Sequence, residues 1–262
     1  MSNLLFKIQT LQSAGFRTLI ESLKDILTDA NIIVNKDGIK LIAMDPSHTI
    51  LVHLKLDAHE FQEYTCEMDN IKLGINMINF FKLIKTIGNK DILTLMVDKD
   101  DSNKLIVLIE NSEKNALTKY HINLMDIPDE EIEIPDLMFD SVITMPSSDF
   151  QKLCRDMNYI SDKVEIKSFN NKLIFSCTGD IGSAEHEIIE NDISEGVNFI
   201  KKKSDDMTQG VFLLKHLVMF TKCTNLSSQT KLFLKNEYPL IITYKIASLG
   251  EIKLCLAPVV NE

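Results

Sequence analysis

Residues that could carry out catalysis are few in this chain, and they do not form a known catalytic pattern. Asp45 and His48 lie close together, but no nucleophile accompanies them. The sequence contains no P-loop, no GxGxxG motif, no HExxH motif and no nucleophile elbow. We therefore expect a protein that is not an enzyme, with no catalytic residue, no metal ligand and no cofactor.

The cysteines also indicate that the chain has no metal site, and they do not form a disulfide framework. The chain has five of them, an odd number, widely spread and without a CxxC pair: Cys66, Cys154, Cys177, Cys223 and Cys255. A disulfide framework needs an even set at close spacing, and a zinc site needs paired ligands. The pattern instead favours free thiols in a reducing compartment.

Positive charge is concentrated in a chain that is acidic overall, with a formal net charge of −10. Two windows, 71–90 and 211–235, hold only bases among their charged residues: Lys72, Lys82, Lys85 and Lys90 in the first, and Lys215, Lys222, Lys231 and Lys235 in the second. A local cluster of lysines is typical of sequence-independent phosphate contacts. Lysines on a solvated helix face that serve only solubility are the alternative.

The elements that carry these bases are predicted to be helices in a chain composed mostly of strands. Short runs rich in Ile, Leu and Val, separated by turn residues, predict strands at 39–43, 50–56, 93–97, 105–109, 173–177, 231–234 and 240–245. Apolar residues at helical spacing predict four helices. The first has Ser13 as its N-cap and apolar positions from Phe16 to Leu27. The others are expected at 77–87, 147–160 and 212–223.

The first and third helices, and the second and fourth, are separated by roughly equal lengths of chain. We interpret this as an internal duplication of an α+β domain with antiparallel sheets. The expected boundaries are 1–124 for the first domain and 142–262 for the second. The segment 125–141 between them is an acidic connector, since it carries many acids, two prolines and no base.

Several segments resemble the proliferating cell nuclear antigen family, in the same order and over the full length. They are GIKLIAMDPSHTILVHL at 38–54, LGIN at 73–76, GNKDI at 88–92, MPS at 145–147, CRD at 154–156, SCTGDIG at 176–182, FTK at 220–222 and YPLIITYKIASLGEIKLCLAPVV at 238–260. Any one of these segments is a weak signal, but together they are specific to the family.

The resemblance implies a DNA sliding clamp: a head-to-tail homotrimer whose antiparallel sheets lie outside and whose four helices per chain line a ring around duplex DNA. The family's inner-face basic positions correspond to Arg17, Lys24, Lys82, Lys85, Lys152, Arg155, Lys215 and Lys222. Subunits of the family join through edge strands, here about 116–124 and 181–188, with Tyr120, Ile122, Ile181 and Ala184 at the joint. The position of one further family lysine holds Thr18.

The family also binds partners in a hydrophobic groove, which accepts a short motif of a Gln, an aliphatic and two aromatic residues. By position its walls are Met44, His48, Ile132, Ile134, Pro239, Cys255, Leu256, Ala257 and Pro258. The partners that the resemblance implies are a DNA polymerase, for which the clamp is a processivity factor, a clamp loader, flap endonuclease, DNA ligase and other proteins with the motif. Cys255 replaces the usual tyrosine, which predicts a wider groove. Asn170 replaces the lysine that carries ubiquitin.

Two other function classes remain open at this point. A metal-dependent nuclease would be detected by divalent-cation-dependent cleavage, and a clamp-like subunit of a hetero-ring, or one that no longer encircles DNA, by its solution mass. No apolar run approaches the ~20 residues of a membrane helix, and the N-terminus does not resemble a signal peptide. No membrane partner is therefore expected, and the family resemblance implies a nuclear or other intracellular replication site.

Overall fold

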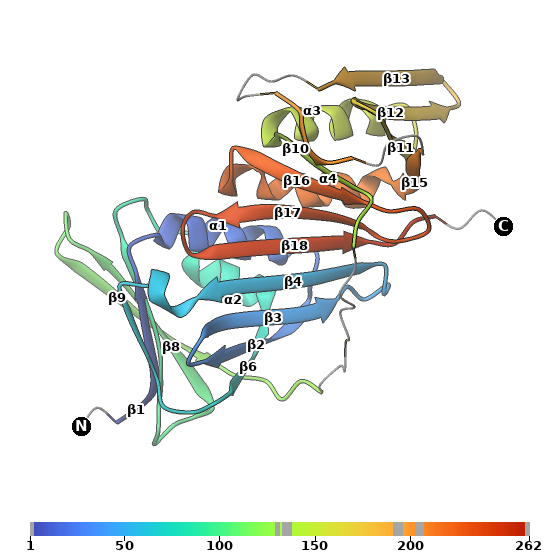
Figure 1. Ribbon diagram of the computed structural model, residues 1–262. Coiled ribbons are helices and arrows are strands. Elements are labelled where there is room, and N and C mark those ends of the chain that lie inside the picture. Colours follow the sequence, from blue (N-terminus) through green and yellow to red (C-terminus); the bar gives the residue numbers. More distant parts are fainter. Residues whose placement is uncertain (1–2, 129–131, 133–137, 191–195, 203–206, 260–262) are drawn as a thin grey trace. The chain divides into compact units, whose positions relative to one another are not determined.

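The computed structural model describes residues 3–128, 132, 138–190, 196–202 and 207–259. The chain separates into two compact units (Figure 1). Unit 1 comprises residues 1–46, 52–132 and 245–252, and unit 2 comprises residues 47–51, 133–244 and 253–262. Each unit therefore contains a short segment from the other half of the sequence.

The elements of the first half run in the order strand, helix, five strands, helix and three strands, with one 3₁₀ turn. Their bounds are β1 (Leu4–Thr10), α1 (Ser13–Leu23), β2 (Asp29–Asn35), β3 (Gly38–Met44), β4 (Ile50–Asp57), η1 (Ala58–Glu60), β5 (Glu63–Cys66), β6 (Ile71–Asn76), α2 (Met77–Ile84), β7 (Ile92–Asp98), β8 (Lys104–Asn111) and β9 (Ala116–Asn123).

The second half repeats this order. Its elements are β10 (Ser141–Pro146), α3 (Ser147–Asn158), β11 (Lys163–Phe169), β12 (Lys172–Gly179), β13 (Gly182–Ile189), β14 (Asn198–Lys201), β15 (Thr208–Leu213), α4 (Leu214–Phe220), η2 (Thr221–Leu226), β16 (Gln229–Leu234), β17 (Leu240–Ile246) and β18 (Gly250–Leu256). The duplication predicted from the sequence is confirmed, because the two halves share one order of strands and helices.

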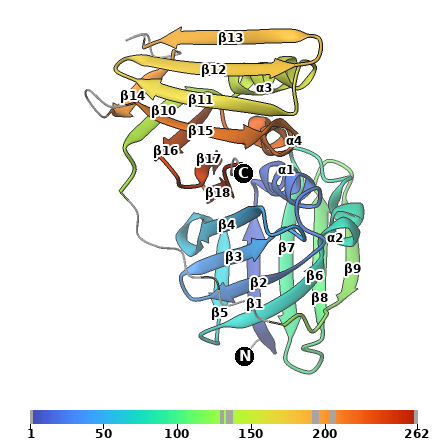
Figure 2. The same ribbon diagram turned by 90° about the vertical axis from the view of Figure 1, so that its right-hand side faces the viewer.

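The strand pairing repeats as well. Unit 1 has the five-stranded order β5-β1-β7-β8-β9, and unit 2 has the matching order β14-β10-β16-β17-β18. The strands β4-β3-β2-β6 of unit 1 correspond in the same way to β13-β12-β11-β15 of unit 2. Figure 2 shows β13, β12 and β11 side by side in unit 2, with β13 outermost. All strand pairings whose register is resolved are antiparallel.

Alternating side chains build the core of each unit. Val52, Leu54 and Leu56 on β4 are at most 2% exposed, while the residues between them are partly or fully exposed. This period-two burial is what a sheet with one covered face requires. The covering layer is a helix pair in each unit, α1 with α2 and α3 with α4. Phe16 of α1 meets Phe80 of α2 edge to face, with ring centroids 6.3 Å apart.

The predicted strands are confirmed, but the helices are shorter than predicted. Ser13 is the first residue of α1 and not its N-cap, which is Gln12. The Ser13 hydroxyl instead donates to the carbonyl oxygen of Asp91, at 2.5 Å. Helix α1 ends at Leu23, so Leu27 packs in the core from the following segment.

The bounds of the other helices also differ from the predictions. Helix α2 ends at Ile84 and buries Met77, Phe80 and Ile84, whereas Ile78 is 43% exposed. Helix α3 ends at Asn158 and buries Phe150, Leu153 and Met157. Phe212 and Leu213 close strand β15, so α4 begins at Leu214 and continues after Phe220 as the 3₁₀ helix η2. Apolar periodicity does not separate a buried strand end from the helix that follows it.

The GNKD segment after α2 holds the helix pair of unit 1 in place. The buried Asp91 carboxylate accepts hydrogen bonds from the Gly88 amide at 2.8 Å and from the Asn111 side chain at 2.6 Å. With the Ser13 bond, Asp91 connects α1, the end of α2 and strand β8. A buried carboxylate is stable only when it is hydrogen-bonded in this way.

Candidate nucleic-acid interface and partner groove

The four basic positions of unit 1 lie on α1 and α2 or at their C-terminal ends, but they differ in exposure and in their side-chain partners. Arg17 is half-buried, and its guanidinium donates to the Ile87 carbonyl oxygen. Lys24 is the C-cap residue of α1, forms an ion pair with Asp25 at 2.8 Å and lies 5.2 Å from the Phe81 ring centroid. Lys82 and Lys85 are exposed. The two α2 lysines are therefore the ones best placed to meet a phosphate.

The four basic positions of unit 2 are all exposed. Lys152 and Arg155 stand three residues apart on α3, Lys215 lies in the first turn of α4, and Lys222 lies in η2. Residues three apart share a helix face. Acids also lie on α3, because Asp149 and Asp156 are exposed. On α4 and η2 the exposed charges are lysines alone.

The two predicted joining strands are edge strands. Strand β9 ends the five-stranded order of unit 1, and β13 ends the four-stranded order of unit 2. Tyr120 and Ile122 are half-buried and alternate with exposed residues on β9. Ala184 is half-buried on β13, while Ile181 lies in the preceding turn and is 78% exposed. An exposed edge strand presents unpaired amide and carbonyl groups to a partner strand.

Unit 2 brings together part of the predicted groove. The Ala257 amide donates to the Thr49 carbonyl oxygen at 3.1 Å, so the segment after β18 lies beside the turn that holds His48. His48 has a positive φ of 53° and is exposed, as are Pro239 and Ala257. Pro258 is half-buried. Leu256 is 0% exposed, so it belongs to the core and not to the accessible surface of the groove.

Burial shapes the chemistry of Cys255, the one predicted groove residue with a perturbed titration. Desolvation raises the pKa of its thiol to about 11, and the nearby Lys253 cation lowers it only partly. The thiol is therefore neutral at pH 7 and acts as a small apolar side chain.

In unit 1, Met44 ends β3 and Ile132 is half-buried. The beginning of the connector lies along β6 and β2, because the Met125 amide donates to the Gly74 carbonyl oxygen and the Asn31 side chain donates to the Ile127 carbonyl oxygen. Ile134 lies outside the described residues, as does most of the acidic run of the connector.

Two exposed aromatic residues were not predicted. Tyr238 adjoins Pro239, and its ring centroid lies 4.4 Å from the Lys235 ammonium nitrogen. Tyr159 follows α3 and is 79% exposed, beside the turn that holds Ile181. Single exposed aromatic residues are common on protein surfaces, so these two do not by themselves define an interaction surface, and their exposure is visible only in the folded chain.

Among the described residues, no group of three or more His, Cys, Asp or Glu side chains is arranged to hold a metal ion. No described helix is long and apolar enough to cross a membrane.

Comparison with known proteins agrees with this architecture. Residues 5–132 match the family described as proliferating cell nuclear antigen, N-terminal domain, and residues 133–259 match the C-terminal domain of the same family. The chain is also 36% identical over 263 residues to a protein of Paramecium bursaria Chlorella virus 1 described as probable DNA polymerase sliding clamp 1. This alignment covers 99% of the chain and 98% of the viral protein. The chain therefore belongs to the proliferating cell nuclear antigen family of sliding clamps.

Proposed function

We propose that three copies of this chain form a closed head-to-tail ring around duplex DNA and act as a processivity factor for a DNA polymerase. The two clamp domains are residues 1–124 and 142–262, and residues 125–141 connect them. The protein has no catalytic role of its own. It acts at a replication site within the cell, which is the nucleus in a eukaryotic host.

The observation that carries the ring is the internal repeat. Strand β9 corresponds to β18, and β13 corresponds to β4. Within unit 1, the Asp57 amide after the buried part of β4 donates to the Leu249 carbonyl oxygen before β18, at 2.8 Å. Strand β18, the equivalent of β9, thus lies beside β4, the equivalent of β13. The exposed β9 and β13 of two copies offer the same pairing, and a heterologous contact of this kind forms rings when it closes.

The described helices support passage of DNA through such a ring. Lys82, Lys85, Lys152, Arg155, Lys215 and Lys222 are exposed on or next to them, although the whole chain carries a formal charge of −10. Contacts of a few lysines to phosphates are weak, salt-sensitive and independent of sequence. Retention then comes from the closed ring, while the contacts permit sliding. Tethering a polymerase raises its local concentration at the primer end.

The partner groove is assigned to Met44, His48, Ile132, Ile134, Pro239, Cys255, Ala257 and Pro258, while the predicted Leu256 is fully buried and supports the groove from the core. Its apolar side chains suit a single-turn helical plug with two aromatic residues, and its backbone groups near the C-terminus suit the polar ends of that plug. A clamp loader, flap endonuclease, DNA ligase and other proteins that carry the motif are the expected partners.

The test of the ring is the solution mass, measured by light scattering over a dilution series. One chain is 29.8 kDa, so three chains give 3 × 29.8 = 89.4 kDa. A stable mass near 89 kDa, together with retention on circular but not on linear DNA after loading, is the expected result. A chain that stays near 30 kDa at all concentrations, without or with circular DNA and loader, would overturn the homotrimer.

A further inference from the structure

The repeat allows each residue of β13 to be matched with a residue of β4. Asn35 pairs with Gly38 across the turn of the β2–β3 hairpin, and Phe169 pairs with Lys172 across the equivalent turn of the β11–β12 hairpin. The second turn residues, Asp37 and Asn171, are therefore equivalent. The Ala58 amide donates to the Asp37 carbonyl oxygen at 2.9 Å, and the Glu190 amide donates to the Asn171 carbonyl oxygen at 2.8 Å.

Ala58 and Glu190 thus occupy the same place in the two units. Counting four residues back from each matches Leu54 with His186. Leu54 is 2% exposed, because β4 lies between β3 and β18 and its inner side chains are enclosed. His186 is exposed, because β13 has a strand on one side only. The chain therefore places an ionisable imidazole where its own repeat places a buried leucine.

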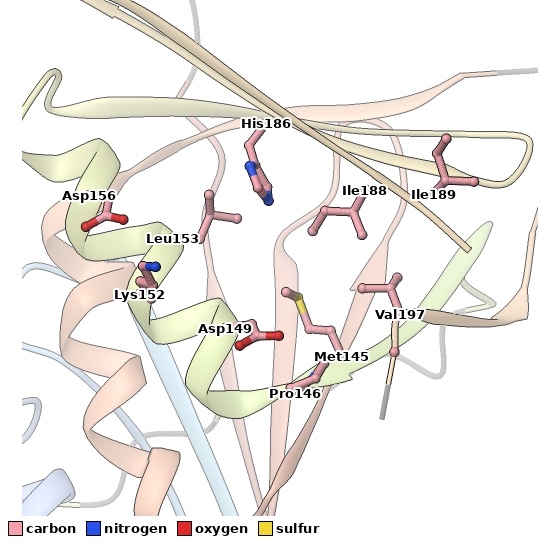
Figure 3. A pocket seen from close by; sticks show the side chains of 11 residues that line it. Met145, Pro146, Asp149, Lys152, Leu153, Asp156, His186, Ile188, Ile189 and Val197 are labelled. Atoms are coloured by element: carbon pink, nitrogen blue, oxygen red, sulfur yellow. The ribbon is translucent and has the colours of Figure 1, made fainter. Parts of the chain in front are cut away.

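His186 lines a cavity of about 480 Å³ in unit 2. Figure 3 shows the imidazole pointing from β13 into the cavity, near Leu153 and Ile188. Met145, Leu153 and Val197 are buried in its wall, and the charged groups that border it, Asp149, Lys152 and Asp156, all come from α3. The side chains nearest the imidazole, Leu153 and Ile188, are apolar. On α3 the positive charge of Lys152 partly balances the negative charges of Asp149 and Asp156.

The occupant that fits this cavity is strand β9 of a second copy. By the repeat, β9 corresponds to β18, the strand beside β4. Its inward-facing positions are Thr118, Tyr120 and Ile122, two of which are half-buried apolar side chains without a full covering layer. Among them only Tyr120 carries an ionisable group, and its phenol has no positively charged form.

We propose that closure of the joint buries His186 in its neutral form, so that ring assembly depends on pH. This inference rests on the proposed ring. Burial in an apolar site disfavours the charged imidazolium, as Leu54 at the matching position illustrates by its enclosure. A free subunit keeps His186 exposed to water, where the charged imidazolium is solvated. Acidification therefore favours the open subunit, and raising the pH favours the closed joint.

The expected size follows from the ordinary titration of histidine. If the closed joint excludes the proton, the dissociation constant of each joint should rise about tenfold between pH 7.5 and pH 5.5, because the free subunit gains a proton that the closed joint cannot hold. The rise should begin near pH 7 and steepen toward pH 5.5.

The experiment measures the trimer dissociation constant of the full chain by sedimentation at fixed ionic strength from pH 8 to pH 5.5. His186→Leu copies the residue of the equivalent β4 position, so it should keep the trimer and remove the pH dependence. His121→Gln is the matched control, because His121 is an exposed histidine on β9 whose side chain alternates with those facing inward. It should retain the wild-type pH dependence.

The outcomes separate the two proposals. A wild-type trimer whose dissociation constant does not change with pH, or falls on acidification, would overturn the role of His186 and leave the ring standing. A pH dependence that persists in His186→Leu would also overturn the role of His186 without contradicting the ring. A wild-type chain that is monomeric at every pH would overturn the ring itself, and this inference with it.

Discussion

Gly74 and Met125 face each other in an isolated antiparallel bridge, in which the Met125 amide donates to the Gly74 carbonyl oxygen at 2.9 Å. This contact holds the first residue of the connector against β6. It requires a glycine, because a Cβ at position 74 would lie 2.1 Å from the Met125 carbonyl oxygen. The LGIN segment at 73–76 therefore has a structural reason for its glycine: close approach of two backbones.

Replacing Gly74 with alanine should detach the connector and destabilise the protein. We expect Gly74→Ala to lower the free energy of unfolding by about 1–3 kcal/mol, the usual cost of overpacking. It should also weaken binding of a motif peptide, since Ile132 follows the displaced segment. The change is measured by urea unfolding and by peptide titration.

Gly15→Ala is the matched control for this substitution. Gly15 lies within α1, and a Cβ there meets no atom within 4 Å. Alanine at an open helical position should stabilise the chain by about 0.5–1 kcal/mol and leave peptide binding unchanged. If the two variants had the same stability, the contact with Met125 would not be a constraint.

The sequence predicted the strands, the duplication and the four helices, because their apolar periods are strong and repeat in both halves. It misplaced the helix ends for a physical reason. Leu27, Ile87 and Ile160 continue the apolar period beyond the last helical turn, and two of them pack in the core from the segment that follows the helix. Ser13 has the residue type of an N-cap, but its hydroxyl satisfies the carbonyl oxygen of Asp91 from a distant segment.

The basic positions were found from the sequence, but the sequence did not show which of these side chains are already bound to other groups of the protein. Arg17 and Lys24 have the same charge as Lys85, yet they bind the Ile87 carbonyl oxygen and Asp25, respectively. The Arg17 partner depends on a tertiary contact that spacing does not reveal, whereas Asp25 is the next residue after Lys24 and only the folded chain shows that the two are paired. His186 escaped notice for a similar reason, because its position becomes informative only when the repeat matches it with the buried Leu54.

Charge reversal at the helices should impair sliding without unfolding the chain. Lys82→Glu combined with Lys222→Glu places acids at two exposed positions, one in each unit. We expect a clear loss of polymerase processivity that is largest at low salt, because phosphate contacts are electrostatic. Stability should change by less than about 1 kcal/mol, as is usual for surface substitutions.

The control for charge alone is Lys114→Glu combined with Lys245→Glu. Both lysines are exposed and lie outside the helices, in the turn before β9 and on β17. This variant has the same net charge as the first one and should keep wild-type processivity. Equal losses in both double variants would show that total charge, and not the helix positions, governs contact with DNA.

Alkaline pH should destabilise the protein through its buried thiols and phenols. Burial raises the pKa of Cys255 to about 11 from an ordinary value of 9, and it also raises the pKa of Cys154 and Tyr244. A raised pKa means that the folded state holds its proton where the unfolded state has released it. The contribution to stability is therefore complete below pH 9 and is lost as the pH rises from 9 to 11.

Cys255→Ala tests how much the Cys255 thiol contributes to the loss of stability at alkaline pH. Two pKa units correspond to about 2.7 kcal/mol. About 2 kcal/mol of this is lost between pH 8.5 and pH 11, so the variant should lose about 2 kcal/mol less stability than wild type over that range. Urea unfolding at several pH values measures the difference. An unchanged slope with pH would mean that Cys255 is not desolvated. Wild-type Cys255 should also react slowly with iodoacetamide at pH 8, because the thiolate is scarce.

The groove assignment depends most on the connector, where Ile132 is half-buried and Ile134 lies outside the described residues. Ile132→Ala with Ile134→Ala removes apolar surface from the wall that should contact the aromatic residues of the motif. We expect the affinity for a fluorescent motif peptide, measured by anisotropy, to fall at least about tenfold, as for buried interface anchors. The solution mass should stay unchanged, because neither residue lies on β9 or β13.

Met138→Ala is the control for this double variant, since Met138 is 78% exposed near the other end of the same connector. It removes exposed apolar surface from a position outside the assigned groove. Peptide affinity should therefore stay within about twofold of wild type. A loss at Met138 with no loss at Ile132 and Ile134 would move the binding surface toward β10, and the groove would have to be reassigned from the walls that the family resemblance implies.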